Sequence, residues 1–97
     1  MTEQALIKMS EEQIAAALET HSEWIELNNQ IQRTYAFDDF IASMKFVNAI
    51  AEYAEQVQHH PDMLIRYNKV TLTVSTHDAN GITNKDFELA AKADRLV

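Results

Sequence analysis

Three histidines are the residues of this chain best suited to chemistry. His59 and His60 are adjacent and precede Pro61, and His77 follows a run in which apolar and hydroxyl-bearing residues alternate. Imidazole gains or loses a proton near neutral pH, so these side chains suit proton transfer in either direction. The structural alternative for His59 is that its imidazole only caps the end of a helix.

Two carboxylates could support these histidines. Glu55 lies four residues before His59, which places both side chains on one face of a helix. That carboxylate and the C-terminal end of the helix dipole both favour the protonated imidazole, so the pattern predicts that His59 is a general acid. Asp86 follows Thr83 at the spacing of a helix cap, and it could also orient a histidine across the site. Both interpretations of Asp86 stay open at the level of sequence.

Other kinds of active site find less support. The chain has no cysteine, which excludes disulfides, thiolate nucleophiles and thiolate metal ligands. No two histidines show His-x-His or His-x-x-x-His spacing, so a zinc site built from His59, His60 and Glu55 is disfavoured. With a single glycine, the chain cannot form a glycine-rich phosphate loop. His21 has no partner near it in the sequence and is expected at the surface.

Composition and charge limit the class of protein. The 97 residues, 46% of them hydrophobic, predict one domain over residues 1–97 with a modest core. Eight basic and 15 acidic residues give a net charge of −7, which would repel phosphate backbones, so we expect no nucleic-acid partner. The chain shows no apolar run of the roughly 20 residues that span a bilayer and no secretory signal pattern. We therefore expect no membrane association and a cytoplasmic location.

The elements that position the histidines begin with a helix and a hairpin. A capping-box pattern starts at Ser10, and the apolar spacing after it predicts a helix to about Thr20. Residues 24–27 and 31–37 have the alternation of strands and flank two asparagines, which tolerate positive φ. This pattern predicts a β-hairpin.

The longest predicted helix begins at an N-cap, Asp38 or Asp39, and continues to His59. Two apolar stripes follow it at helical spacing, one through Val47 and a second through Phe46. The core needs one such stripe. The second stripe therefore indicates either a wide core face or contact with another subunit.

The remaining elements repeat the arrangement of a hairpin followed by a helix. Pro61 ends the long helix, and residues 63–67 and 70–74 predict a second hairpin. Gly81, the only glycine, is expected to take a left-handed conformation in the loop that follows. A capping box at Thr83 predicts a last helix. The order α-β-β-α-β-β-α predicts an α+β fold with a four-stranded antiparallel sheet and three helices on one face.

In this order the chemical residues resemble the motif of the pterin-4a-carbinolamine dehydratase family. That motif is a charged residue, three residues, His-His-Pro, five or six residues, an aromatic residue, nine residues, His and a later Asp. The matching residues are Glu55, His59-His60-Pro61, Tyr67, His77 and Asp86. The similarity extends over about residues 10 to 95, and several fixed spacings met at once make a specific signal.

The resemblance implies an enzyme, a hydro-lyase that needs no metal or redox cofactor. Such a 4a-hydroxytetrahydrobiopterin dehydratase expels the 4a-hydroxyl of its pterin substrate as water and leaves quinonoid dihydropterin. The reaction belongs to the recycling of the pterin used in aromatic amino acid hydroxylation. It asks for an acid at the hydroxyl and a base at N5–H.

The resemblance also implies which residues form the site. Substrate contacts are expected in His59-His60-Pro61 and in Thr76-His77-Asp78-Ala79, with Glu55 and Asp86 in support. His59, His60 and His77 are the implied catalytic residues. We expect His59 to be the acid, His77 the base or a ring-binding group, and His60 mainly a binding residue. Some relatives carry an aromatic pair after His-His-Pro, where this chain has Met63 and Leu64, so we expect pterin stacking either to be weaker or to be supplied by Trp24 or another ring.

Partners follow from the same resemblance. Members of the family form homodimers or homotetramers, so besides the pterin substrate we expect a homodimer or homotetramer. Animal members also stabilise the dimer of a homeodomain transcription factor, through the helix face that otherwise forms the tetramer. An interaction module acting through the long helix is therefore the alternative function. We favour self-association as the use of that helix.

Overall fold

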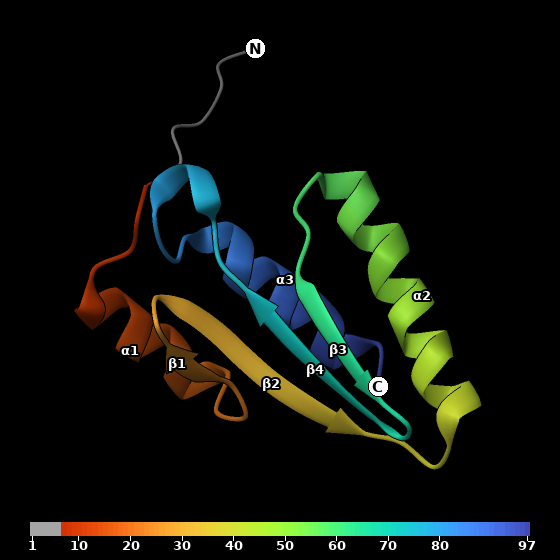
Figure 1. The fold of residues 1–97 in the computed structure, drawn as a ribbon. Helices are drawn as coiled ribbons and strands as arrows, with labels where there is room; N and C mark the ends of the chain where they lie inside the picture. Colours follow the sequence, from red (N-terminus) through yellow and green to blue (C-terminus); the bar gives the residue numbers. More distant parts are fainter. Residues whose placement is uncertain (1–6) are drawn as a thin grey trace.

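The structure, a computed structural model that describes residues 7–97, has a sheet layer and a helix layer (Figure 1). The four-stranded antiparallel sheet carries three helices on one face, which confirms the predicted fold class and element order. The elements are α1 (Glu11–Thr20), β1 (Ile25–Leu27), β2 (Gln30–Ala36), α2 (Phe40–Val57), β3 (Asp62–Arg66), β4 (Lys69–Val74), the short 3₁₀ turn η1 (His77–Ala79) and α3 (Asn84–Arg95).

Two sequence expectations concern membranes and export. Within residues 7–97, the structure contains no helix that is both long enough and apolar enough to cross a bilayer. The expectation that the chain has no secretory signal concerns its N-terminal residues. Of these, residues 1–6 lie outside the part of the chain that the structure describes.

The strands lie in the order β1-β2-β4-β3, and their side chains alternate between two faces. On the inner face Tyr35 pairs with Val70, and both are buried beneath the helices. On the open face Thr34 pairs with Thr71, and their hydroxyls lie 2.7 Å apart. Apolar residues on one face only are typical of an antiparallel sheet with one face in water.

Local signals explain where most elements begin and turn. The capping box that starts at Ser10 is present, as is the one that starts at Thr83. Asp39, not Asp38, caps α2, because its carboxylate accepts the backbone N–H of Ala42. Asn28 and Asn29 take positive φ values of 54° and 63° in the β1–β2 turn, as predicted.

Helix α2 ends earlier than predicted. Its last residue is Val57, and Gln58 takes a left-handed conformation with φ of 54°. The carbonyl of Ala54 accepts the backbone N–H of Gln58 and also that of His59, the latter at 3.1 Å, which closes the helix end. His59 therefore lies beyond the helix, where the spacing rule that placed it above Glu55 no longer holds.

The two apolar stripes on α2 are the two sides of one wide core face. Ile50, which belongs to neither stripe, is fully buried between them, and Val47 and Phe46 are buried beside it. Phe46 is 4% exposed within its own chain, so its burial gives no argument for a partner subunit.

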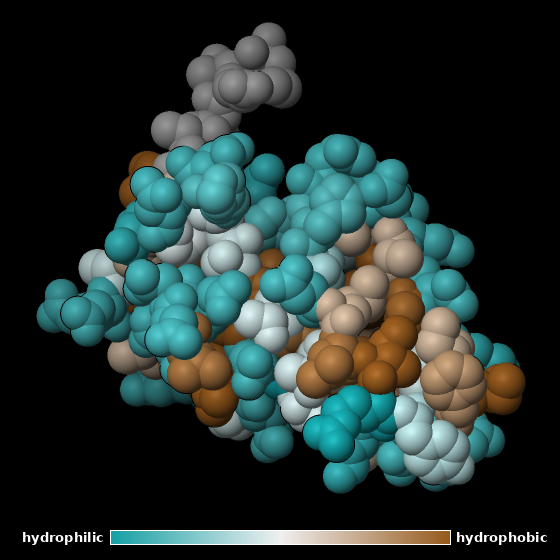
Figure 2. All heavy atoms as spheres, in the orientation of Figure 1, coloured by the Kyte–Doolittle hydropathy of each residue, from teal (hydrophilic) through white to brown (hydrophobic). Residues whose placement is uncertain are grey.

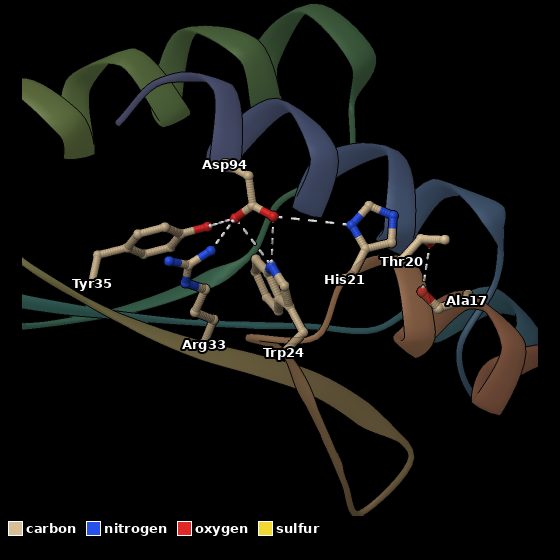
Figure 3. A network of polar contacts seen from close by, with 7 residues as sticks. All are labelled: Ala17, Thr20, His21, Trp24, Arg33, Tyr35 and Asp94. Atoms are coloured by element: carbon tan, nitrogen blue, oxygen red, sulfur yellow. Dashed lines mark hydrogen bonds and ion pairs between the residues drawn. The ribbon is translucent and has the colours of Figure 1, made fainter.

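A carboxylate in the last turn of α3 joins the helix layer to the sheet (Figure 3). Asp94 accepts hydrogen bonds from the indole Nε1 of Trp24, the guanidinium of Arg33 and the hydroxyl of Tyr35. His21, at the end of α1, lies with its Nδ1 3.9 Å from the same carboxylate. The expectation that His21 is an isolated surface residue is therefore wrong. Burial, reinforced by the hydrogen bond to Asp94, raises the pKa of the Tyr35 phenol well above its usual range.

The role predicted for Gly81 is also wrong. Asn80, with φ of 59°, takes the left-handed position, and no glycine in the described chain has positive φ. Asn is among the residues that tolerate this conformation best. Gly81 has little space around it, however. A Cβ atom at this position would lie 2.7 Å from the side-chain Cε of Lys8.

The first prediction concerns this loop. Gly81→Ala is expected to lower the free energy of unfolding by less than about 1 kcal/mol, because the backbone is unstrained and the exposed Lys8 side chain can move aside. Asn80→Val, which forces a β-branched residue into the left-handed region, is expected to cost about 1–2 kcal/mol. Urea denaturation measures both. The reverse order of the two losses would contradict this account of the loop.

A second prediction follows from the raised pKa of Tyr35. The unfolded chain loses a tyrosine proton near pH 10, whereas the folded chain keeps the Tyr35 proton to higher pH. The free energy of unfolding should therefore fall as pH rises above about 10. Denaturation at several pH values should show a shallower fall for Tyr35→Phe than for the unsubstituted chain. An equally steep fall for Tyr35→Phe would contradict the prediction.

Candidate functional site

The structure brings the three predicted histidines to one shallow pocket of about 240 Å³. It lies where the chain leaving α2, the η1 turn and the start of α3 meet, at one end of the sheet (Figure 1). Its lining residues are Gln58, His59, His60, Ser75, Thr76, His77, Asp78 and Lys85. A small molecule in this pocket could contact all three imidazoles at once.

The geometry of His59 is set by a buried carboxylate. Its Nε2 lies 2.7 Å from Oδ1 of Asp86, whose side chain has no exposure to solvent. The other oxygen of Asp86 accepts the hydroxyl of Thr76 at 2.9 Å and the backbone N–H of Thr83 at 2.8 Å. Asp86 therefore has both of the functions that the sequence left open, since it caps α3 and also contacts a histidine.

This contact determines which nitrogen of His59 is available. A carboxylate accepts hydrogen bonds, so it stabilises a proton on the imidazole Nε2. The remaining nitrogen, Nδ1, is then the atom of His59 that can exchange a proton with a ligand. A buried aspartate that fixes the tautomer and orientation of a histidine is the arrangement known from hydrolase triads.

Glu55 contacts a different histidine from the one predicted. Its Oε2 lies 2.6 Å from Nε2 of His60, and both side chains are more than half exposed. The prediction that Glu55 supports His59 is therefore wrong. The left-handed Gln58 is the physical reason, because it turns the chain at the helix end and brings His60 to Glu55. His60 thus has a solvent-screened partner, and His59 has a buried one.

The second predicted segment contributes unevenly to the pocket. His77 is exposed at the start of η1, and Asp78 lies beside it in the lining. Thr76 also borders the pocket, but it is 3% exposed and its hydroxyl contacts Thr83 and Asp86. Neither Pro61 nor Ala79 is among the lining residues.

Sequence reasoning missed some residues and misplaced another. Gln58, Ser75 and Lys85 border the pocket but were not among the predicted site residues, and each is a neighbour of a motif residue. Trp24, expected as a stacking surface for the substrate, is 2% exposed and belongs to the core. Its indole is bonded to Asp94, so it has no free face for a ligand.

Metal binding has no structural support within the described part of the chain. Residues 7–97 contain no group of three or more His, Cys, Asp or Glu side chains arranged to hold a metal ion. The arrangement can instead move protons, because one imidazole is backed by a buried carboxylate, one by an exposed carboxylate, and a third, that of His77 on η1, borders the same pocket.

Comparison with known proteins extends over nearly the whole chain. The sequence model of the family described as pterin 4 alpha carbinolamine dehydratase matches residues 7–96. A relative from Picosynechococcus, named "Putative pterin-4-alpha-carbinolamine dehydratase", is 46% identical over 92% of this chain and 97% of its own. A relative of the same name from Herpetosiphon aurantiacus is 52% identical over 82% of this chain and 83% of its own.

Two solved structures share the fold. The transcriptional coactivator/pterin dehydratase from Brucella melitensis superposes with a TM-score of 0.89 at 32% identity, over 92% of this chain and 97% of its own. A pterin dehydratase-like protein, described as a RuBisCO assembly factor in the alpha-carboxysome, gives a TM-score of 0.63 at 19% identity. It covers 75% of this chain and 84% of its own, and at that identity it shows the fold alone.

A third prediction tests the buried contact. Asp86→Ala is expected to lower the free energy of unfolding by about 3–5 kcal/mol, because it removes the buried acceptor of the donors on His59, Thr76 and Thr83. Glu55→Gln is the matched control. It weakens a carboxylate–imidazole contact of similar length that lies in solvent, and it should change stability little. If urea denaturation showed the same loss of unfolding free energy for both variants, the distinction between a buried and an exposed contact would be wrong.

Proposed function

The chain belongs to the pterin-4a-carbinolamine dehydratase family, and we propose that it catalyses the dehydration of 4a-hydroxytetrahydropterins, 4a-hydroxytetrahydrobiopterin among them. The observation that carries the proposal is the shared pocket of His59, His60 and His77, in which two of the imidazoles are backed by carboxylates. The product, quinonoid dihydropterin, would return to the pterin pool that serves aromatic amino acid hydroxylation.

The reaction is an elimination without change of oxidation state. A proton is delivered to the 4a-hydroxyl, the C4a–O bond breaks and water leaves. The proton on N5 passes to a base, and its electron pair forms the N5=C4a double bond. Acid and base must therefore reach two neighbouring atoms of one bicyclic ring, which a pocket lined by three imidazoles allows.

We assign the roles from the contacts of each histidine. His59 is the acid, acting through Nδ1, and Asp86 is its positioning residue. His77, which borders the same pocket from η1, is the base or binds the ring. His60 binds substrate mainly, and Glu55 orients it from the solvent side. Asp78 completes the binding segment on η1.

The alternative, an interaction module that acts through α2, has one observation in its favour. The Brucella structure, 32% identical, is described as a transcriptional coactivator as well as a pterin dehydratase. The long helix here presents mostly polar residues to solvent, among them Lys45, Asn48 and Glu52. That surface gives no specific support to a transcription-factor partner, whereas the histidine pocket supports an enzyme.

Self-association, as a homodimer or homotetramer, is part of the proposal. Apolar side chains are exposed at the start of α2, where Phe40 is 46% and Ile41 is 65% exposed. More lie on the edge strand β3, which carries Leu64 and Ile65, and Figure 2 shows hydrophobic residues gathered there. Such apolar area beside an unpaired strand edge is typical of an interface.

The fourth prediction concerns turnover of a 4a-hydroxytetrahydropterin generated in the assay. His59→Ala should lower kcat by on the order of 10² or more, the low end for general acid catalysis. Asp86→Asn should lower kcat more than it raises KM, because the amide N–H can donate to an unprotonated Nε2 and so stabilise the wrong tautomer of His59. His60→Ala and Glu55→Gln should mainly raise KM.

The pH profile separates a positioning role for Asp86 from a merely structural one. Asp86→Asn should shift the pH dependence of kcat in the folded enzyme, whereas a variant that is only less stable keeps the profile. If His59→Ala retained near-full kcat while His77→Ala abolished it, the acid and base assignments would have to be exchanged. Absence of turnover by the unsubstituted chain would refute the proposed function.

The fifth prediction is the oligomeric state. Sedimentation at micromolar concentration should give a dimer or tetramer, and Leu64→Lys on the exposed edge strand should shift it toward the monomer. Lys45→Glu, on the solvent face of α2, is a control that leaves the β3 edge intact. A monomer at all concentrations tested would contradict the proposal.

A further inference from the structure

The aromatic residue of the family motif lies far from the histidines. Tyr67 follows β3, whereas His59 and His60 precede that strand, so its five residues separate them from Tyr67 by roughly 16 Å. Figure 1 shows the β3–β4 turn at the opposite end of the sheet from η1. Tyr67 therefore takes no part in the histidine pocket. It borders a second, larger pocket of about 660 Å³ on the open face of the sheet.

Two cations face each other at this turn. Arg66 and Lys69 form the closing pair of the β3–β4 hairpin, and both are exposed and border the pocket. Like charges directly opposite each other in an antiparallel pair are destabilising. Within residues 7–97 neither makes an ion pair with a carboxylate. The other hairpin of the chain closes on an uncharged pair, Leu27 and Gln30.

The backbone at the turn is unfavourable as well. Tyr67 has φ of 53°, in the left-handed region that disfavours bulky side chains, and its ring is 65% exposed. The β1–β2 turn of the same chain has asparagines at its left-handed positions, Asn28 and Asn29. An aromatic ring held in solvent at a strained position is the kind of outlier that points to function.

These features share one explanation. We propose that the pocket at the β3–β4 turn binds a small anionic ligand with a planar ring, of which a mononucleotide is representative. Arg66 and Lys69 would bind the anionic group, which removes their mutual repulsion, and Tyr67 would stack on the ring. The hydroxyls of Thr34 and Thr71 lie on the pocket floor as hydrogen-bonding groups. The volume is within the range of small-molecule sites, and the pocket shares no lining residue with the histidine pocket.

Binding of AMP, inorganic phosphate and adenosine to the full chain, measured by titration calorimetry at low salt, tests the proposal. AMP should bind with Kd of about 1 mM or tighter, more tightly than either phosphate or adenosine. Added salt should weaken the binding of AMP and of phosphate but not the binding of adenosine. Arg66→Gln and Lys69→Gln should each weaken AMP about fivefold, the effect of one exposed charge-assisted contact. Lys45→Gln on α2 removes the same charge elsewhere and should leave the affinity unchanged.

Stability provides a readout that a purely structural turn would not give. Tyr67→Asn supplies the residue found at the other hairpin, so it should keep or raise the midpoint of thermal unfolding while weakening AMP binding. Arg66→Gln should likewise raise the midpoint while it weakens binding. The proposal is overturned if AMP does not bind, if it binds no tighter than phosphate, or if the Lys45 control loses as much affinity. It is also overturned if these variants lose stability with unchanged affinity.

Discussion

Asp86 places a carboxylate with no exposure to solvent at the N-terminus of α3, where it contacts the imidazole of His59, the hydroxyl of Thr76 and the backbone N–H of Thr83. An anion is favourable at a helix N-terminus, and each contact satisfies a group that burial would otherwise leave unpaired. The segment after α2, the segment after β4 and the start of α3 thus meet at one side chain. The histidine pocket exists because these three segments are held together.

The opposite end of α3 is held by a second carboxylate. Asp94 lies in the last turn, where the helix dipole disfavours a negative charge. Hydrogen bonds from Trp24, Arg33 and Tyr35 offset that cost and connect the helix to the β1–β2 hairpin. α3 is therefore held in place at both ends. The Asp86 end orients a group proposed to be catalytic, and the Asp94 end contributes to the fold alone.

The two carboxylate–imidazole contacts of the pocket differ in what surrounds them. His59 and Asp86 are shielded from water, so their geometry is fixed and its loss is costly. His60 and Glu55 lie in solvent, where a contact of similar length is screened and adds little stability. A fixed imidazole suits a chemical step that requires precise alignment, and a mobile one suits substrate entry and release. This difference in burial underlies the separate roles proposed for the two adjacent histidines.

Much of the fold was determined by signals that act within a few residues. The capping boxes at Ser10 and Thr83, the Asn28-Asn29 turn and the strand alternation predicted elements that the structure contains, because each depends on backbone groups close in sequence. The motif spacing likewise identified the three histidines that line one pocket. What the sequence could not determine was the partner of each side chain. α2 ends two residues before the predicted position, at the left-handed Gln58, and Glu55 therefore contacts His60. Asp94 binds Arg33, which is 61 positions away in the sequence. Only packing in three dimensions decides which distant groups share a buried volume, and burial then decides which contacts are strong.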